Sequence, residues 1–197
     1  MNKFKEALAY IPNLKNYNTL DIFAREGDWQ SFILEEKVKS LEAWEIEKKF
    51  IPNLKKNLSN SIIKCKDSIS FINSKPTNIK FELVIIDNGL NCYGKNYCEH
   101  FDFLHNIKHI LTQESYIIFN VVTQPFNYKK NIKWQSRRNS FYNKKDCSKL
   151  DIEFMQSFYL DFFNKNGLDV LNSYTLCREY NKNIDYLYYM VMKLNKI

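Results

Sequence analysis

The sequence predicts a single α/β domain, residues 1–197, built on a mostly parallel sheet. Two observations support this fold class. Short runs of β-branched and aromatic residues alternate with segments of helical hydrophobic spacing, and the last two strand-like runs follow one another without a helix between them. Alternating strands and helices indicate a parallel sheet with helices on both faces. The closing pair indicates a hairpin, which makes one late strand antiparallel.

Seven strand-like segments divide the chain. They lie at 19–23, 38–44, 61–65, 81–86, 116–122, 170–177 and 186–194. Helices are expected at 3–10, 29–34, 47–57, 97–111 and 151–164, with a short helical turn after Asp67. Residues 1–17 are interpreted as an N-terminal helical extension and residues 123–147 as a long loop. The segment 81–86 is the clearest strand, because its nearly continuous apolar run is typical of a strand buried on both faces.

The composition is that of a globular domain. Hydrophobic residues make up 45% and aromatic residues 16% of the chain, which argues against disorder. The five cysteines are odd in number and include no CxxC pair, so neither a disulfide framework nor a zinc ribbon is indicated. No apolar stretch has the length of a signal peptide or a membrane span, and we expect a cytoplasmic protein without membrane contact. The net charge of +7 favours anionic partners or reflects a lysine-rich composition alone.

Acidic residues stand where three of the expected strands end. Asp21 is followed by a turn with Gly27, Glu45 comes about one β/α unit later, and Asp87 ends the clearest strand. The carboxyl edge of an open parallel sheet is where such folds bind polar ligands, and a carboxylate there can accept both hydroxyls of a ribose. The alternatives are that Asp21 caps the following helix and that Glu45 is a surface acid. Asp67 has an equally good alternative as a helix N-cap.

At these residues the chain resembles the class I S-adenosylmethionine (SAM)-dependent methyltransferases, from about residue 18 to 195. The segment Leu20-Asp21-Ile22-Phe23-Ala24-Arg25-Glu26-Gly27 looks like the first motif of that family, with Phe23 and Arg25 standing where the family has glycines. The resemblance implies a Rossmann-like methyltransferase fold with a seven-stranded sheet and an antiparallel C-terminal strand. It also implies SAM as cofactor. The cofactor-binding residues it implies are Asp21, Phe23, Gly27, Glu45, Asp67 and Asp87.

The acceptor would lie beside the same edge. Asp87 faces the methyl-transfer site in this resemblance, and His100 is the nearby side chain that could act as a general base. Asn88 and Tyr93 offer hydrogen bonds to an acceptor. The alternative is that His100 is an ordinary residue of a helix. No carboxylate completes a metal site with the histidines, so no metal is expected.

The segment 123–147 is basic and carries aromatic residues. Trp134 could stack on an acceptor, and Arg137 and Arg138 could bind a phosphate or a carboxylate. The alternative is a solvated basic loop. The residues after Ile86 are not the Asn/Asp-Pro-Pro-aromatic run of the DNA amino-methyltransferases, and no Pro-Cys dipeptide indicates cytosine C5 methylation.

These observations predict a SAM-dependent methyltransferase acting on a small polar acceptor, such as a sugar or another hydroxyl-bearing anionic metabolite. One alternative is an RNA methyltransferase that binds its substrate through the basic segment. The other is a catalytically silent binding module that keeps the methyltransferase fold.

Overall fold

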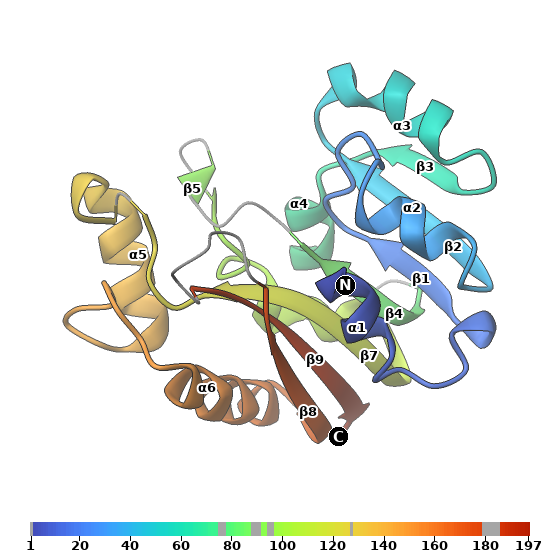
Figure 1. Cartoon of the computed structure of the whole chain (residues 1–197). Helices are drawn as coiled ribbons and strands as arrows, with labels where there is room; N and C mark the ends of the chain where they lie inside the picture. Colours follow the sequence, from blue (N-terminus) through green and yellow to red (C-terminus); the bar gives the residue numbers. More distant parts are fainter. Residues whose placement is uncertain (1, 75–77, 88–91, 94–96, 127, 179–185) are drawn as a thin grey trace.

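The computed structural model describes residues 2–74, 78–87, 92–93, 97–126, 128–178 and 186–197, with backbone alone at 92, 93 and 97. One seven-stranded sheet forms the centre of the molecule, in the order β3-β2-β1-β4-β7-β9-β8 (Figure 1). Its strands are β1 (Asn18–Asp21), β2 (Ser40–Glu45), β3 (Ile62–Cys65), β4 (Phe81–Ile86), β7 (Leu111–Val122), β8 (Leu168–Cys177) and β9 (Leu187–Lys196). A separate short hairpin contains β5 (Cys92–Tyr93) and β6 (Tyr97–Cys98).

The strand directions follow the sequence prediction. β1, β2, β3, β4 and β7 pair in parallel, whereas β9 is antiparallel to both β7 and β8. The prediction of a mostly parallel seven-stranded sheet with an antiparallel C-terminal strand is therefore confirmed. β4 lies centrally between β1 and β7, and its apolar residues Leu83, Val84, Ile85 and Ile86 are fully buried.

Helices cover both faces of the sheet. Successive side chains of a strand point to opposite faces, so a strand with apolar residues throughout needs cover on both sides. Val84 and Ile86 belong to one hydrophobic cluster, and Leu83 and Ile85 belong to another. The first cluster is closed by α4 (Ser68–Asn73), η3 (Leu104–His109), α5 (Ile132–Tyr142) and α6 (Ile152–Lys165). The second is closed by α1 (Lys3–Leu8), α2 (Gln30–Glu35) and α3 (Ile51–Asn57). Three 3₁₀ turns complete the described elements: η1 (Leu14–Asn16), η2 (Lys48–Phe50) and η4 (Tyr128–Lys130).

The helix predicted at 97–111 is wrong. The segment contains β6, a turn, the 3₁₀ helix η3 and the start of β7. Glu99 has a left-handed φ of 49°, and the Asp102 carboxylate accepts a hydrogen bond from the Cys98 backbone N–H at 2.6 Å. A side chain that bonds the local backbone competes with helix formation, and the hydrophobic spacing alone does not reveal it.

The long loop predicted at 123–147 is also wrong, because it contains the 11-residue helix α5. The Asn131 side chain caps its N-terminus by accepting a hydrogen bond from the Trp134 N–H at 2.9 Å. Asn143 ends the helix in the left-handed conformation, with φ of 52°. The polar composition of this segment therefore includes helix-capping residues that the sequence analysis did not identify.

Candidate functional site

Three carboxylates meet at the carboxyl edge of the sheet. Asp21 is the last residue of β1, Glu45 the last of β2, and Asp87 directly follows β4. These strands are neighbours in the order β2-β1-β4, so the three acids share one edge. Asp21 is 3% exposed, Glu45 is 6% exposed, and the Asp87 side chain is 7% exposed. Buried carboxylates in such proximity are costly without a compensating charge, which marks this edge as a candidate ligand site.

Asp21 lies at the centre of this edge. Its carboxylate accepts hydrogen bonds from Ser31 Oγ at 2.5 Å and from the Phe23 backbone N–H at 3.3 Å. Burial raises the pKa of Asp21 to about 7, and the negative charges of Asp87 and Glu45 raise it further against the effect of the two hydrogen bonds. The carboxyl therefore titrates near neutrality, and its charge depends on what binds beside it.

Glu45 anchors the turn that follows β1. Its carboxylate accepts hydrogen bonds from the backbone N–H of Arg25 at 2.9 Å and of Glu47 at 2.7 Å. Arg25 has a left-handed φ of 47°, the conformation that glycine adopts most readily. The turn thus has a glycine-like backbone conformation at Arg25, a position that the resemblance described above gives to glycine.

Gly27 serves the packing of this turn. Its φ is 69°, and a Cβ there would lie 2.6 Å from Leu54 Cδ1 and 3.0 Å from Leu58 in the neighbouring α3 segment. The structure therefore needs glycine at this position for its conformation and for close contact with α3.

Asp87 is held by four side chains from different parts of the chain. Arg178 Nη1 lies 3.0 Å from both carboxylate oxygens, and Tyr189 Oη donates at 2.7 Å. Asn120 Nδ2 donates at 2.7 Å, and Gln30 Nε2 donates to the same carboxylate. Burial raises the pKa of Asp87, and the Arg178 guanidinium and the Tyr189 hydroxyl oppose that shift.

None of these four partners of Asp87 was predicted from the sequence. Tyr189 and Asn120 lie inside strands that the hydrophobic pattern assigns to the core, and Gln30 lies in α2. Arg178 directly follows β8, more than 90 residues from Asp87. Arg178 is the first basic residue after the end of β8, and this was the one signal of a role that the sequence offered. Its pairing with Asp87 could not be predicted, because it depends on the order of the strands in the sheet.

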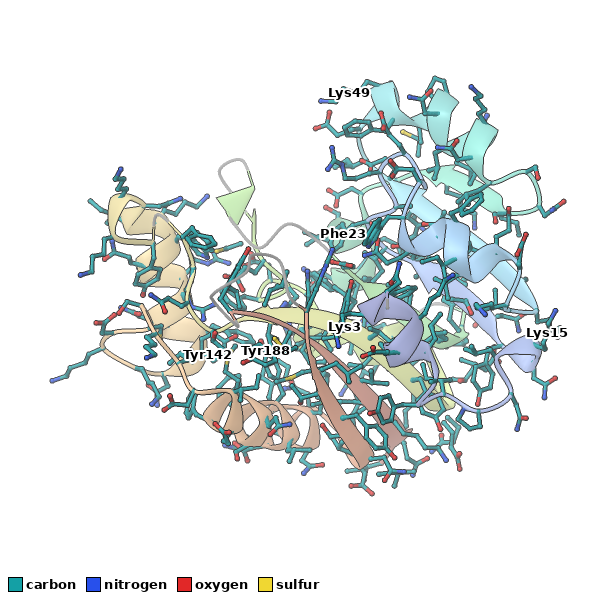
Figure 2. All side chains as sticks on the ribbon, viewed as in Figure 1. Lys3, Lys15, Phe23, Lys49, Tyr142 and Tyr188 are labelled. Atoms are coloured by element: carbon teal, nitrogen blue, oxygen red, sulfur yellow. The ribbon has the colours of Figure 1, made fainter. Side chains whose placement is uncertain are left out.

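Phe23 and Asp67 each lie two residues beyond a strand end, after β1 and β3. Phe23 packs edge-on against Phe103 with ring centroids 5.8 Å apart, and Figure 2 shows it near the middle of the molecule, between the β1–β3 part and the α5–α6 part. Asp67 caps α4, because its carboxylate accepts hydrogen bonds from the Ser70 N–H at 3.0 Å and the Ser70 Oγ at 2.7 Å. The N-cap alternative for Asp67 is thus observed.

His100 lies in the hydrophobic core and not at the sheet edge. It is fully buried among aromatic rings, including Phe101 and Phe119, and its Nε2 lies 2.5 Å from Tyr159 Oη. Burial and the nearby charge of Arg138 lower the pKa of His100 to about 3. A general base must reach its proton and titrate near the working pH, so this position does not fit the role suggested for His100.

The residues suggested for acceptor binding are mostly engaged within the protein. Trp134 is buried and donates from Nε1 to Glu99 at 2.6 Å. Arg138 is fully buried, pairs with Glu99 at 3.3 Å and donates to backbone carbonyl groups. Arg137 pairs with Asp102. These contacts replace the solvent-facing stacking and phosphate-binding roles that a loop would have permitted.

Asn88 and the side chain of Tyr93 lie outside the described residues. Among the residues that are described, no group of three or more His, Cys, Asp or Glu side chains could hold a metal ion. No helix in the described parts of the chain has the length and apolar character needed to cross a membrane.

Comparisons with known proteins identify the fold. No protein-family model matches the sequence, and a search of curated proteins finds no match. Among solved structures, the N-methyltransferase NodS from Bradyrhizobium japonicum is 11% identical to this chain, with a TM-score of 0.64. The alignment covers 99% of this chain and 95% of the NodS chain. A candidate RNA methyltransferase from Pyrococcus horikoshii is 16% identical and covers 100% and 85%, with a TM-score of 0.60.

A third solved structure, the magnesium protoporphyrin IX methyltransferase of Synechocystis with bound S-adenosylhomocysteine (SAH), is 10% identical. It covers 98% of this chain and 81% of its own, with a TM-score of 0.62. Identities this low establish the architecture alone. The similarity spans the whole chain, and the strand order and the antiparallel β9 agree with it. The protein therefore has the Rossmann-like fold of the class I methyltransferases.

Proposed function

We propose that this protein is a SAM-dependent methyltransferase that binds its cofactor at the edge formed by β1, β2 and β4. The observation that carries the proposal is the cluster of buried carboxylates of Asp21, Glu45 and Asp87. SAM brings a sulfonium and an ammonium group, so its positive charge would offset the burial and the neighbouring carboxylates that together raise the pKa of Asp21. The fold supports the same cofactor.

The residues at this edge fit such a ligand. A carboxylate has about four lone-pair positions, so Glu45 could accept the ribose hydroxyls while it holds the N–H groups of Arg25 and Glu47. Asp21 would pair with the ammonium group, and Phe23 would offer the ligand an apolar surface. Gly27 keeps the turn packed against α3, and Asp67, which caps α4, would be the residue that holds the adenine. When bound, SAM would supply an electrophilic methyl group for transfer to the acceptor.

The two residues suggested as catalytic, His100 and Asp87, are both engaged within the protein, and this constrains the acceptor class. His100 is buried, and Asp87 is engaged by Arg178 and Tyr189. A small hydroxyl-bearing acceptor, which the sequence favoured, needs proton removal by a base. An acceptor with an amine or an aromatic ring nitrogen needs less assistance and fits this site better. Methyl transfer then depends mainly on in-line placement of the acceptor.

Titration calorimetry with SAM and SAH tests the proposal. We expect both to bind, and we expect both affinities to rise between pH 6 and pH 8 as Asp21 loses its proton near pH 7, because both ligands carry the ammonium group that Asp21 would face. The Asp21→Asn variant should bind SAM more weakly and lose this pH dependence. Absence of SAM binding at millimolar concentration, with the protein folded, would leave the catalytically silent module as the better description.

A further inference from the structure

The net positive charge of this protein comes from one segment. Residues 123–150 contain eight Lys and Arg and one Asp. The whole chain has 29 basic and 22 acidic residues, so the remaining residues hold 21 of each and are neutral overall. The full net charge of +7 therefore lies in this segment, which contains η4, α5 and the turn that follows α5.

The segment is fixed to the protein core by its inner side. Arg138 is fully buried and donates hydrogen bonds to the carbonyl groups of Val122 and Cys147 as well as to Glu99. The Leu150 N–H donates to Thr123 O at 2.9 Å, which closes the base of the segment. The charges outside are therefore held on a packed element, in contrast to a solvated loop.

The arginines and the lysines of this segment have different roles. Arg137 and Arg138 pair with Asp102 and Glu99. Five other cations are exposed, and within the described residues none of the five forms an ion pair with a carboxylate. We call this group the lysine patch: Lys129, Lys130, Lys144, Lys145 and Lys149.

Tertiary contacts bring the two ends of the lysine patch together. Lys129 and Lys130 precede α5, whereas the other three lysines follow it. Tyr128 Oη donates to Asn139 Oδ1 at 2.6 Å and accepts a hydrogen bond from the Cys147 N–H at 3.3 Å. These bonds dock η4 against the turn after α5, so the lysines before and after the helix are exposed on segments that lie next to each other.

The lysine patch lies on the acceptor side of the proposed active site. α5 follows β7, whose C-terminal end belongs to the same edge of the parallel strands as Asp21 and Asp87. Figure 1 shows α5 at this edge, across from the part of the molecule that contains β1, β2 and α3. A polymer bound to the patch and following this edge of the sheet would reach the three carboxylates.

The chemistry around the patch favours a polar polyanion. The outward residues of α5 and its end include exposed Ser136, Ser140 and Asn143, which can donate hydrogen bonds to phosphate and sugar oxygens. Ile132 is the exposed large apolar residue of α5, whereas a membrane-binding helix needs a continuous apolar face. An acidic protein would be expected to use the arginines, which here are engaged internally.

We propose that the lysine patch binds the phosphate backbone of RNA and presents it to the active site. RNA is favoured over duplex DNA because Arg137 and Arg138 are both paired, which leaves α5 without a free arginine to read base edges in a major groove. Folded RNA is recognised largely through its backbone and shape, for which lysines suffice. The identification of the bound RNA as the methyl acceptor rests on the proposed function; the binding itself does not.

The test compares two variants of the full chain that carry equal charge changes. The patch variant combines Lys129→Gln, Lys130→Gln, Lys145→Gln and Lys149→Gln. The control combines substitutions at four exposed lysines on the other half of the protein: Lys37→Gln, Lys39→Gln, Lys55→Gln and Lys56→Gln. Fluorescence anisotropy of a labelled RNA stem-loop is measured over about 50 to 200 mM KCl. Circular dichroism verifies that both variants fold.

We expect the patch variant to bind RNA at least about tenfold more weakly, with a log–log salt slope lower by about 3, because four backbone contacts are lost. The control variant should stay within about twofold of the unmodified protein at the same salt concentrations. Equal weakening in both variants would overturn the proposal, and so would equal affinity for duplex DNA. Binding to anionic phosphatidylserine vesicles without RNA binding would assign the patch to membranes instead.

Calorimetry with SAM on the same proteins separates this proposal from the proposed function. Both variants should keep the SAM affinity of the unmodified chain, because none of the substituted lysines contacts the carboxylate edge. RNA binding that maps to the lysine patch in a protein that fails to bind SAM would retain the RNA surface and reject the methyltransferase. SAM binding without RNA binding would reject the RNA surface alone.

Discussion

Arg178 reaches both carboxylate oxygens of Asp87 with one guanidinium nitrogen, at 3.0 Å to each. This ion pair joins the end of β8 to the end of β4, although β7 and β9 lie between the two strands. The side chains are 16% and 7% exposed, so the pair is largely withdrawn from water. Removal of one partner of such a pair leaves an uncompensated buried charge.

The Arg178→Met variant should therefore be destabilised by about 3 kcal/mol in urea unfolding. The loss should be greater at pH 8 than at pH 5, because Arg178 opposes the burial that raises the pKa of Asp87. Adding Asp87→Asn should restore part of the stability. Lys165→Met, which breaks the exposed pair with Asp161, is the control and should cost less than about 0.5 kcal/mol. Equal costs for the two single variants would contradict the burial argument.

Asp21 predicts a pH dependence of folding stability. Its folded pKa of about 7 lies above the ordinary value of 3.8, so folding favours the protonated carboxyl. Its contribution is complete below about pH 4 and is lost as the pH rises through 7, for a total on the order of 4 kcal/mol. Asp21→Asn should unfold with a flatter stability profile between pH 5 and pH 8. Parallel profiles for the two proteins would show that Asp21 does not titrate in this range.

Substitution of Glu45 should weaken cofactor binding without loss of the fold. Glu45→Ala removes the acceptor of the Arg25 and Glu47 N–H groups, and we expect at least about tenfold weaker SAM binding by calorimetry. Glu47→Ala removes only an exposed side chain paired with Lys49 and serves as the control. Unchanged SAM affinity in a folded Glu45→Ala protein would refute the ribose assignment.

Two substitutions in the turn after β1 should have opposite consequences. Gly27→Ala places a Cβ against Leu54 at a left-handed φ and should cost about 2 kcal/mol in thermal or urea unfolding. Arg25→Gly should change stability by less than about 1 kcal/mol, because φ of 47° suits glycine. A tolerated Gly27→Ala would mean that α3 yields at this contact.

Because His100 is buried among aromatic rings, we expect that phenylalanine can replace it. His100→Phe keeps the ring packing against Phe101 and Phe119, so methyl transfer should not fall on the order of the hundredfold that removal of a general base causes. The measurement is the single-turnover rate with the acceptor saturating. A hundredfold lower single-turnover rate with SAM affinity intact would show that His100 takes part in the reaction.

Hydrophobic periodicity and strand-end chemistry determined much of the fold. The run 81–86 predicted a buried strand and is β4, and the two closing runs predicted the β8–β9 pair. Asp21, Glu45 and Asp87 were predicted to share an edge because parallel strands bring their carboxyl ends together, and the strand order confirms this arrangement.

Tertiary structure alone decided how those acids and cations are used. Local pattern predicted a helix at 97–111 and a loop at 123–147, and both were wrong because capping and buried ion pairs govern these segments. The partners of Asp87 come from β7, β9, α2 and the end of β8, which only the order of the strands brings together. The sequence by itself determined which residues carry charge and which are apolar. Long-range packing decided which of the charges are buried in pairs and which, as in the lysine patch, face solvent.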